Sequence, residues 1–209
     1  NRTPPKTQSA LLEAMQEHKV TAGGKTYDLD EPFFVLATQN PIEQEGTYPL
    51  PEAQVDRFLF KVLIDYPNDA DEVELVRAVT GGRVGDVLDV SLVEPIISAE
   101  GVLKLQRTAA KVRVDEAVAA YAVRLTRATR EWPGARIGAG PRGAIALVRA
   151  GRASALLHGR DFAVPDDIKS VARPVLRHRL ALEPEAELDG QTPEQLLVAI
   201  LERIEAPRQ

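Results

Sequence analysis

The sequence has no cysteine, and only 5% of its 209 residues are aromatic. Without cysteine the chain can form neither disulfides nor metal sites built from thiolates. With so few aromatic side chains, it lacks the usual means of stacking on single-stranded nucleic acid. No apolar run approaches the roughly 20 residues needed to cross a bilayer, and nothing resembles a signal peptide. We therefore expect a cytoplasmic protein.

Histidine is also scarce. His18, His158 and His178 lie far apart, without the spacing of metal ligands, and no arrangement of Ser, His and Asp typical of a nucleophilic site is visible. We expect ordinary roles for all three histidines and no metal site. The first residue is Asn1 rather than Met, so we also expect the chain to be a piece of something longer.

The net charge of -5 conceals a strong segregation of charge. Residues 43–102 carry 13 acidic and 4 basic side chains, whereas residues 103–181 carry 16 basic and 6 acidic ones. Residues 182–209 return to 7 acidic against 2 basic. Such asymmetry indicates a nucleic-acid surface, contact between the acidic part of one subunit and the basic part of another, or simply two solvated faces.

Periodicity predicts a short α/β piece followed by an all-helical domain, and we place the two domains at residues 1–92 and 93–209. The first should contain a helix at 6–17, a hairpin at 19–29 and a second helix at 71–79. Two buried strands are expected at 33–38 and 58–64. The second should contain helices from 98, over 115–130, over 142–158, from 165 to about 177, and from 192 to 204. A short extended piece is expected at 112–114.

The tripeptide Gly24-Lys25-Thr26 has the appearance of a phosphate-binding loop. That motif needs a Gly five residues before the Gly-Lys pair, where this sequence has Lys19, and it needs a helix after it. Because both flanks favour strands, we interpret this segment as the turn of the hairpin.

Residues 33–58 are the most informative stretch. An apolar run ends at Asn40 and Pro41, a proline-rich loop follows, and Arg57 precedes a second apolar run. Polar groups at the carboxyl end of a buried strand lie where α/β sheets bind ligands. Taken alone, Asn40 could cap a turn and Arg57 could pair with Asp56 at the surface. Arg142, at the start of a helix, opposes the helix dipole, so it is either an ordinary surface residue or has an anionic partner.

Together these residues resemble the MoxR family of AAA+ ATPases. The similar segments are residues 1–17, 37–58, 138–142 and 152–179, and the second is long and nearly unbroken. One departure is Gly140, which stands where the family has Ser. The resemblance implies a partial P-loop NTPase (AAA+) core with parallel strands and a β-hairpin, followed by an all-α lid. The family's phosphate-binding loop and magnesium-binding acidic pair belong upstream of Asn1 and are not in these residues.

The resemblance also implies roles for individual residues. Asn40 corresponds to the sensor that positions the attacking water, Arg142 to the second sensor, and Arg57 to the arginine finger that reaches a neighbouring subunit's nucleotide. Glu52 and Arg2 are further candidates for intersubunit contacts. Amide and guanidinium groups suit phosphoryl transfer, which depends on positioning and on charge stabilisation.

The implied function is an ATPase that uses ATP and Mg²⁺, forms a hexameric ring, and remodels or assembles client protein complexes, metalloproteins among them. We expect the present chain alone to be inactive. We do not expect nucleic acid or a membrane as a partner. The alternative is a non-catalytic nucleic-acid-binding module that uses the basic residues of 103–181, which would show salt-dependent affinity.

Overall fold

The computed structural model describes residues 4–39, 50–81 and 93–207. The chain divides into two compact units, one formed by Asn1–Lys61 with Ala99–Gln209 and the other by Val62–Ser98. No helix in the described ranges is long and apolar enough to cross a membrane.

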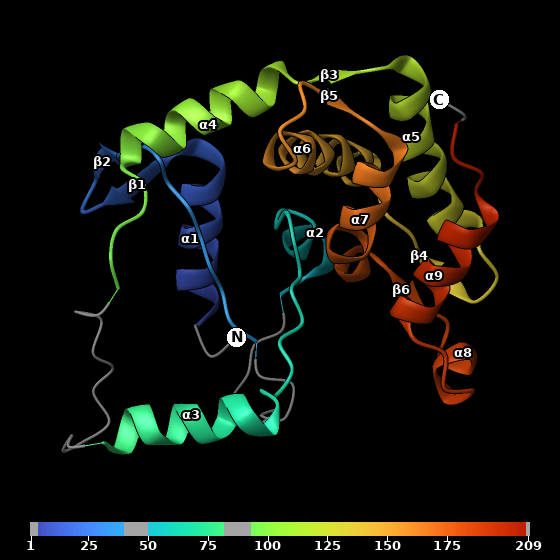
Figure 1. The fold of residues 1–209 in the computed structure, drawn as a ribbon, viewed down its shortest axis with the longest axis horizontal. Helices are drawn as coiled ribbons and strands as arrows, with labels where there is room; N and C mark the ends of the chain where they lie inside the picture. Colours follow the sequence, from blue (N-terminus) through green and yellow to red (C-terminus); the bar gives the residue numbers. More distant parts are fainter. Residues whose placement is uncertain (1–3, 40–49, 82–92, 208–209) are drawn as a thin grey trace. The chain divides into compact units, whose positions relative to one another are not determined.

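The first unit begins with α1 (Pro5–Glu17) and a hairpin of β1 (Lys19–Ala22) and β2 (Lys25–Asp28) (Figure 1). The strands pair antiparallel, with Ala22 opposite Lys25, so Gly23 and Gly24 alone form the turn. Both glycines have positive φ, 59° and 76°, as a two-residue hairpin turn of type I′ requires. The predicted helix and hairpin are confirmed, and the segment around Lys25 is not a phosphate-binding loop.

The helical region, residues 99–207, completes this unit. Its helices are α4 (Ala99–Lys111), α5 (Glu116–Glu131), α6 (Pro141–Leu157), α7 (Pro165–Leu176), α8 (Pro184–Leu188) and α9 (Pro193–Arg203), with a 3₁₀ turn η2 (Arg177–Arg179). Short strands join them: β3 (Arg113–Val114) runs parallel to β5 (Phe162–Ala163), and β4 (Ala135–Ile137) antiparallel to β6 (Ala181–Leu182). The predicted helices are confirmed to within a few residues at each end, while β4, β5, β6 and α8 were not foreseen.

The helix starts follow from local chemistry. The Asp115 carboxylate accepts a hydrogen bond from the N–H of Ala117 at 2.8 Å, which caps α5. Thr192 and Gln195 cap α9 reciprocally, each side chain accepting from the other residue's N–H. Both arrangements satisfy amide donors that a helix leaves unpaired in its first turn.

The hydrophobic core of the helical region lies among α5, α6, α7 and α9 (Figure 1). Its fully buried side chains include Leu125, Leu147, Ile168 and Ile200, one from each of these helices. Close approach of α6 and α7 requires a small residue at Gly151, because an added Cβ would lie 2.6 Å from Cδ1 of Ile168. This core supports the start of α6 and the end of α7.

The two predicted buried strands are wrong for the described residues. The structure assigns neither 33–38 nor 58–64 to a strand, and apolar side chains along them are exposed, including Phe34 at 78% and Ile64 at 91%. An apolar run indicates burial but does not supply the neighbouring strand that a ladder needs, and no described strand pairs with either segment. The first unit also contains α2 (Glu52–Val55), a single turn between these two segments.

The second unit contains α3 (Asp69–Thr80), where a helix was predicted over 71–79. Asn68 caps it, with its side-chain oxygen accepting from the N–H of Asp71 at 3.0 Å. No residue of α3 is buried within the described chain.

A buried ion pair organises the start of α7. Asp167, 3% exposed, accepts two hydrogen bonds of 2.7 Å from Arg160, one from the Ser154 hydroxyl, and one from the N–H of Val164. Burial by itself would raise the pKa of Asp167, but these hydrogen bonds and the charge of Arg160 outweigh it and lower the pKa. The carboxylate therefore stays ionised and connects α6, the residues between α6 and α7, and the start of α7.

We predict that Asp167→Ala lowers the free energy of unfolding by about 3 kcal/mol, because it leaves several buried donors without an acceptor. Asp161→Ala is the matched control, since Asp161 also pairs with an arginine, Arg113, but both side chains are at least 74% exposed. The decrease in the free energy of unfolding caused by Asp161→Ala should be much smaller. Urea unfolding followed by circular dichroism measures both, and equal losses would contradict the prediction.

Candidate functional site at the end of α2

The candidate site residues predicted from the sequence are distributed unevenly over the structure. Asn40 and Arg2 lie outside the described residues. Glu52 is the first residue of α2, Arg57 follows the end of that turn, and Arg142 is the second residue of α6. The geometry of the site therefore concerns α2, the chain after it, and the helical region.

The turn of α2 fixes the backbone that carries Arg57. The N–H groups of Arg57 and Phe58 donate to the carbonyls of Gln54 and Val55 at 3.2 and 3.1 Å. Arg57 is half-buried, and its Nη1 is buried with no hydrogen-bond partner among the described residues. A buried guanidinium nitrogen without an acceptor is costly, and because Nη1 is buried, an acceptor from outside could reach it only if the side chain moves.

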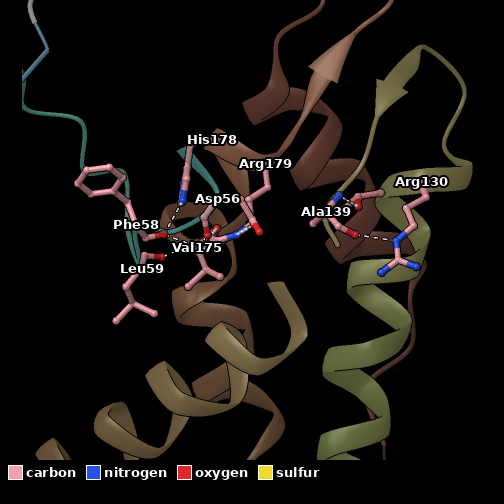
Figure 2. Close-up of polar contacts among 9 residues, drawn as sticks. Asp56, Phe58, Leu59, Arg130, Ala139, Val175, His178 and Arg179 are labelled. Carbon is pink, nitrogen blue, oxygen red and sulfur yellow. Dashed lines mark hydrogen bonds and ion pairs between the residues drawn. The ribbon is translucent and has the colours of Figure 1, made fainter. Parts of the chain in front are cut away.

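Arg179 holds the residues on both sides of Arg57 (Figure 2). Its Nε donates to the Asp56 carboxylate at 2.8 Å, and its Nη2 donates to the carbonyls of Asp56 and Phe58 at 2.9 and 2.7 Å. Its Nη1 donates to the carbonyl of Leu59 at 3.4 Å and to that of Val175. A guanidinium has five N–H donors, and each has an acceptor here. We call Arg179 and its four partners, Asp56, Phe58, Leu59 and Val175, the Arg179 cluster.

Two neighbours extend the contact between the end of α7 and the chain after α2. His178 Nε2 lies 2.9 Å from the Phe58 carbonyl, and the N–H of Lys61 donates to the carbonyl of Pro174 at 2.9 Å. The last carbonyls of a helix lack partners within it. At α7 two of them, those of Pro174 and Val175, accept from Lys61 and Arg179.

Electrostatics in the cluster depend mainly on burial. Burial lowers the pKa of Arg179, Asp56 acts in the opposite direction, and the positive charge of Arg142 lowers it further. Burial and the charge of Arg179 lower the pKa of His178 from 6.5 to about 4. His178 is therefore neutral at pH 7. It must donate from Nε2, because a carbonyl can only accept, and its Nδ1 is buried with no partner in the described chain.

The loop before Arg142 is fixed by a separate set of contacts, seen on the right of Figure 2. Arg130 Nε donates to the Ala139 carbonyl at 2.6 Å, and the Ala139 N–H donates to the Thr129 hydroxyl at 2.9 Å. A Cβ on Gly138 would lie 2.6 Å from the backbone of Arg130, so the loop can approach α5 only with glycine there. Arg142 follows this loop with its side chain exposed.

Glu52 also has a partner within the chain. Its carboxylate lies 3.5 Å from Nη2 of Arg136 on β4, and both side chains are more than half exposed. An exposed pair of this length contributes little to stability.

The structure accounts for much of the positive charge of residues 103–181. Seven arginines there form ion pairs with Asp or Glu, namely Arg113, Arg127, Arg136, Arg160, Arg173, Arg177 and Arg179. An arginine held by a carboxylate is a poorer phosphate contact, so these pairs weigh against a nucleic-acid surface. Within the described chain, no group of three or more His, Cys, Asp or Glu could hold a metal ion.

Sequence reasoning missed the two residues that determine this geometry. His178 was expected to have an ordinary role, and Arg179 was noted only as the end of the tract 152–179. Asp56 was considered as a surface partner of Arg57, but its carboxylate pairs with Arg179, 123 positions further along the chain. The run Arg177-His178-Arg179 after a helix was the available signal, and it does not identify its acceptors.

Two family descriptions match this chain. Residues 1–60 match the ATPase family associated with various cellular activities (AAA), and residues 127–200 match the AAA lid domain. The matches cover α1, the hairpin, α2 and most of the helical region.

Named relatives match over nearly the whole chain. The uncharacterized protein YeaC of Bacillus subtilis is 46% identical over all of this chain and 64% of its own length. The chaperone MoxR1 of Mycobacterium tuberculosis is 42% identical over all of this chain and 56% of its own length. The protein MoxR of Methylorubrum extorquens is 34% identical over 99% of this chain and 64% of its own length. The chain thus spans 56 to 64% of the length of these relatives.

A solved structure agrees with these matches. The crystal structure of a candidate ATPase from Cytophaga hutchinsonii has a TM-score of 0.88 and 43% identity, and the match covers all of this chain and 64% of that one. Together with the family matches, it shows a partial AAA+ core followed by a helical lid, as the sequence predicted.

The low pKa of His178 predicts a loss of stability in acid. The unfolded chain binds this proton below about pH 6.5 and the folded chain only below about pH 4, so the stability it contributes is complete above pH 6.5 and is lost as the pH falls to about 4. We expect a loss on the order of 2 kcal/mol across this window, allowing for partial exposure. Urea unfolding at pH 7 and at pH 4.5 measures it.

His178→Gln keeps a side-chain donor but cannot titrate. It should therefore reduce the difference in the free energy of unfolding between pH 7 and pH 4.5. His158→Gln is the control, because His158 lies at the end of α6 and contacts its own helix through Ser154. It should leave the difference intact. An unchanged pH dependence in His178→Gln would contradict the interpretation.

Proposed function

We propose that this chain, which belongs to the MoxR family of AAA+ ATPases, is the part of an ATP-hydrolysing protein that supplies an arginine to a neighbouring subunit's nucleotide. The observation that carries the proposal is the placement of Arg57. Its backbone is fixed by α2 and by hydrogen bonds from Arg179 to the residues before and after it, while its own guanidinium keeps unused donor capacity. A finger residue needs a rigid backbone and guanidinium donors that are not already paired, and because Nη1 is buried, the Arg57 side chain would turn outward to meet phosphate.

The other polar residues receive roles that suit the same chemistry. Asn40 would orient the attacking water through its amide. Arg142, exposed at the start of α6, would contact phosphate oxygens as the second sensor. Glu52 and Arg2 would make contacts between subunits. Phosphoryl transfer leaves little covalent chemistry to the protein, so an amide and two guanidinium groups are sufficient contributions from this part of the chain.

ATP and Mg²⁺ are the cofactors of this proposal. The guanidinium groups of Arg57 and Arg142 fit the phosphate oxygens of ATP, because arginine forms strong charge-assisted hydrogen bonds with phosphate. The sequence has no Gly-x-x-x-x-Gly-Lys-Thr loop, and the described residues offer no cluster of acidic ligands for the metal. This chain would therefore hold the outer phosphate and orient water, and Mg²⁺ when bound would neutralise charge on the phosphates.

A finger that acts on another subunit makes the active assembly an oligomer, and we propose a hexameric ring. One of the relatives is a chaperone by name, and the chain matches it at 42% identity. We infer that ATP hydrolysis drives remodelling or assembly of client protein complexes. Seven arginines of residues 103–181 already have an acidic partner within the chain, and the basic charge that remains there would favour contact with the acidic residues 43–102 of a neighbouring subunit.

We predict that Arg57→Ala in the full-length protein abolishes ATP turnover and leaves ATP binding nearly unchanged. The finger would stabilise charge that develops only in the transition state, and such residues contribute factors of about 10³ or more to the rate. Steady-state phosphate release and nucleotide titration measure the two quantities. Arg127→Ala is the control, because Arg127 is an exposed arginine paired with Glu131 one helical turn away. Retained turnover in Arg57→Ala would exclude Arg57 as the finger.

A second prediction concerns the 209-residue chain by itself. It should neither bind ATP tightly nor hydrolyse it, because it lacks a phosphate-binding loop. Phosphate release by the purified chain, compared with that of the full-length protein at equal concentration, tests this. Turnover that follows the 209-residue chain through purification and disappears in Arg57→Ala would overturn the prediction.

A further inference from the structure

We propose that Arg179 is a positioning residue for Arg57 and that it makes the conformation of the proposed finger depend on the helical region. This inference rests on the function proposed for Arg57. Arg179 itself would not contact nucleotide, because its side chain is only 3% exposed and each of its donors has an acceptor in the Arg179 cluster.

The contacts lie where they control the Arg57 backbone. Nη2 of Arg179 donates to the carbonyl before Arg57, that of Asp56, and to the carbonyl after it, that of Phe58. One rigid planar group thereby holds the peptide plane before Arg57 and the plane after Phe58, while the plane between Arg57 and Phe58 is held by the hydrogen bond from the Phe58 N–H to the Val55 carbonyl. A rotation of the backbone that redirects the Arg57 side chain must break at least one of these hydrogen bonds.

The other end of the contact belongs to the helical region. Arg179 is the last residue of η2, the 3₁₀ turn that follows α7, and its Nη1 also donates to the carbonyl of Val175 in the last turn of that helix. His178 and Pro174 bind the same short segment through Phe58 and Lys61. The end of α7 and the residues after α2 should therefore move together.

The first turn of α6 supports this connection. The positive charge of Arg142 contributes to the lowered pKa of Arg179, although burial is the larger cause. Gly143 lies against the same helix end, because a Cβ there would be 3.3 Å from Cδ2 of Leu176. A shift of the first turn of α6 would therefore displace the end of α7 and, with it, Arg179.

The fork geometry of arginine is essential to this role. Lysine has three donors at one nitrogen and cannot bind the Asp56 carboxylate and the carbonyls of Asp56, Phe58 and Leu59 together. Arg179→Lys keeps the charge and most of the packing, so it tests positioning more specifically than Arg179→Ala. Asp56→Asn, which keeps the shape but removes the charge of the partner, is a second variant should Arg179→Lys fold poorly.

The experiment measures ATP turnover of the full-length protein in a double-mutant cycle of Arg179→Lys and Arg57→Ala. We expect Arg179→Lys to lower kcat by at least about tenfold with little change in KM for ATP, because a small misplacement of a catalytic group costs that much. In the Arg57→Ala background, measured with excess enzyme, it should lower the residual rate no further. An equal fold-loss in both backgrounds, or wild-type kcat in folded Arg179→Lys, would overturn the proposal.

Arg160→Lys is the matched control. Arg160 also forms a buried pair, with Asp167, but at the opposite end of α7 from Arg179, so this variant should keep kcat. A loss of kcat in Arg160→Lys equal to that in Arg179→Lys would mean that any weakening of the helical region slows turnover, and would overturn a specific role for Arg179.

Hydrogen exchange separates failure of this proposal from failure of the proposed function. In Arg179→Lys, the amides of residues 56–61 should exchange faster than in the wild type, whatever Arg57 does. If Arg57→Ala keeps wild-type turnover, the proposed function of Arg57 fails, and positioning of a finger fails with it even if exchange accelerates. If Arg57→Ala is inactive but exchange at 56–61 is unchanged in Arg179→Lys, only the role of Arg179 is overturned.

Discussion

The buried guanidinium of Arg179 is the constraint on which the arrangement of the candidate site depends. A charge with 3% of its side chain exposed is tolerated only if a carboxylate compensates it and every donor has an acceptor. Asp56 supplies the carboxylate, and four carbonyls take the remaining donors. Those acceptors come from the end of α7 and from the residues after α2, so satisfying one side chain also determines how the two segments meet.

The sequence predicted the helices well because their determinants are local. Asp115 and Thr192 cap helices through contacts within three residues, and apolar side chains at helical spacing identify the buried face. The hairpin was predictable for the same reason, since Gly23 and Gly24 supply the positive φ that its turn needs. Each of these features is decided by a few neighbouring residues, and no distant partner is involved.

Features that depend on distant partners were not predictable in this way. The apolar runs at 33–38 and 58–64 have the composition of buried strands, but a strand exists only when another strand is hydrogen-bonded to it. The pairing of Arg179 with Asp56 spans 123 positions, and nothing near either residue specifies the other. The resemblance implies a role for Arg57, but the residues that hold its backbone follow only from the folded structure.

Burial separates the roles of three arginines that composition alone treats as equivalent. Arg179 has every donor engaged within the chain, so it has nothing left for a ligand and acts on its neighbours. Arg142 is exposed and its charge opposes that of Arg179, so an anion at Arg142 would relieve a repulsion within the site. Arg57 lies between these extremes, half-buried with Nη1 unsatisfied among the described residues. Because that nitrogen is buried, the Arg57 side chain would have to turn outward before phosphate from outside this subunit completes its hydrogen bonding in the role that we propose.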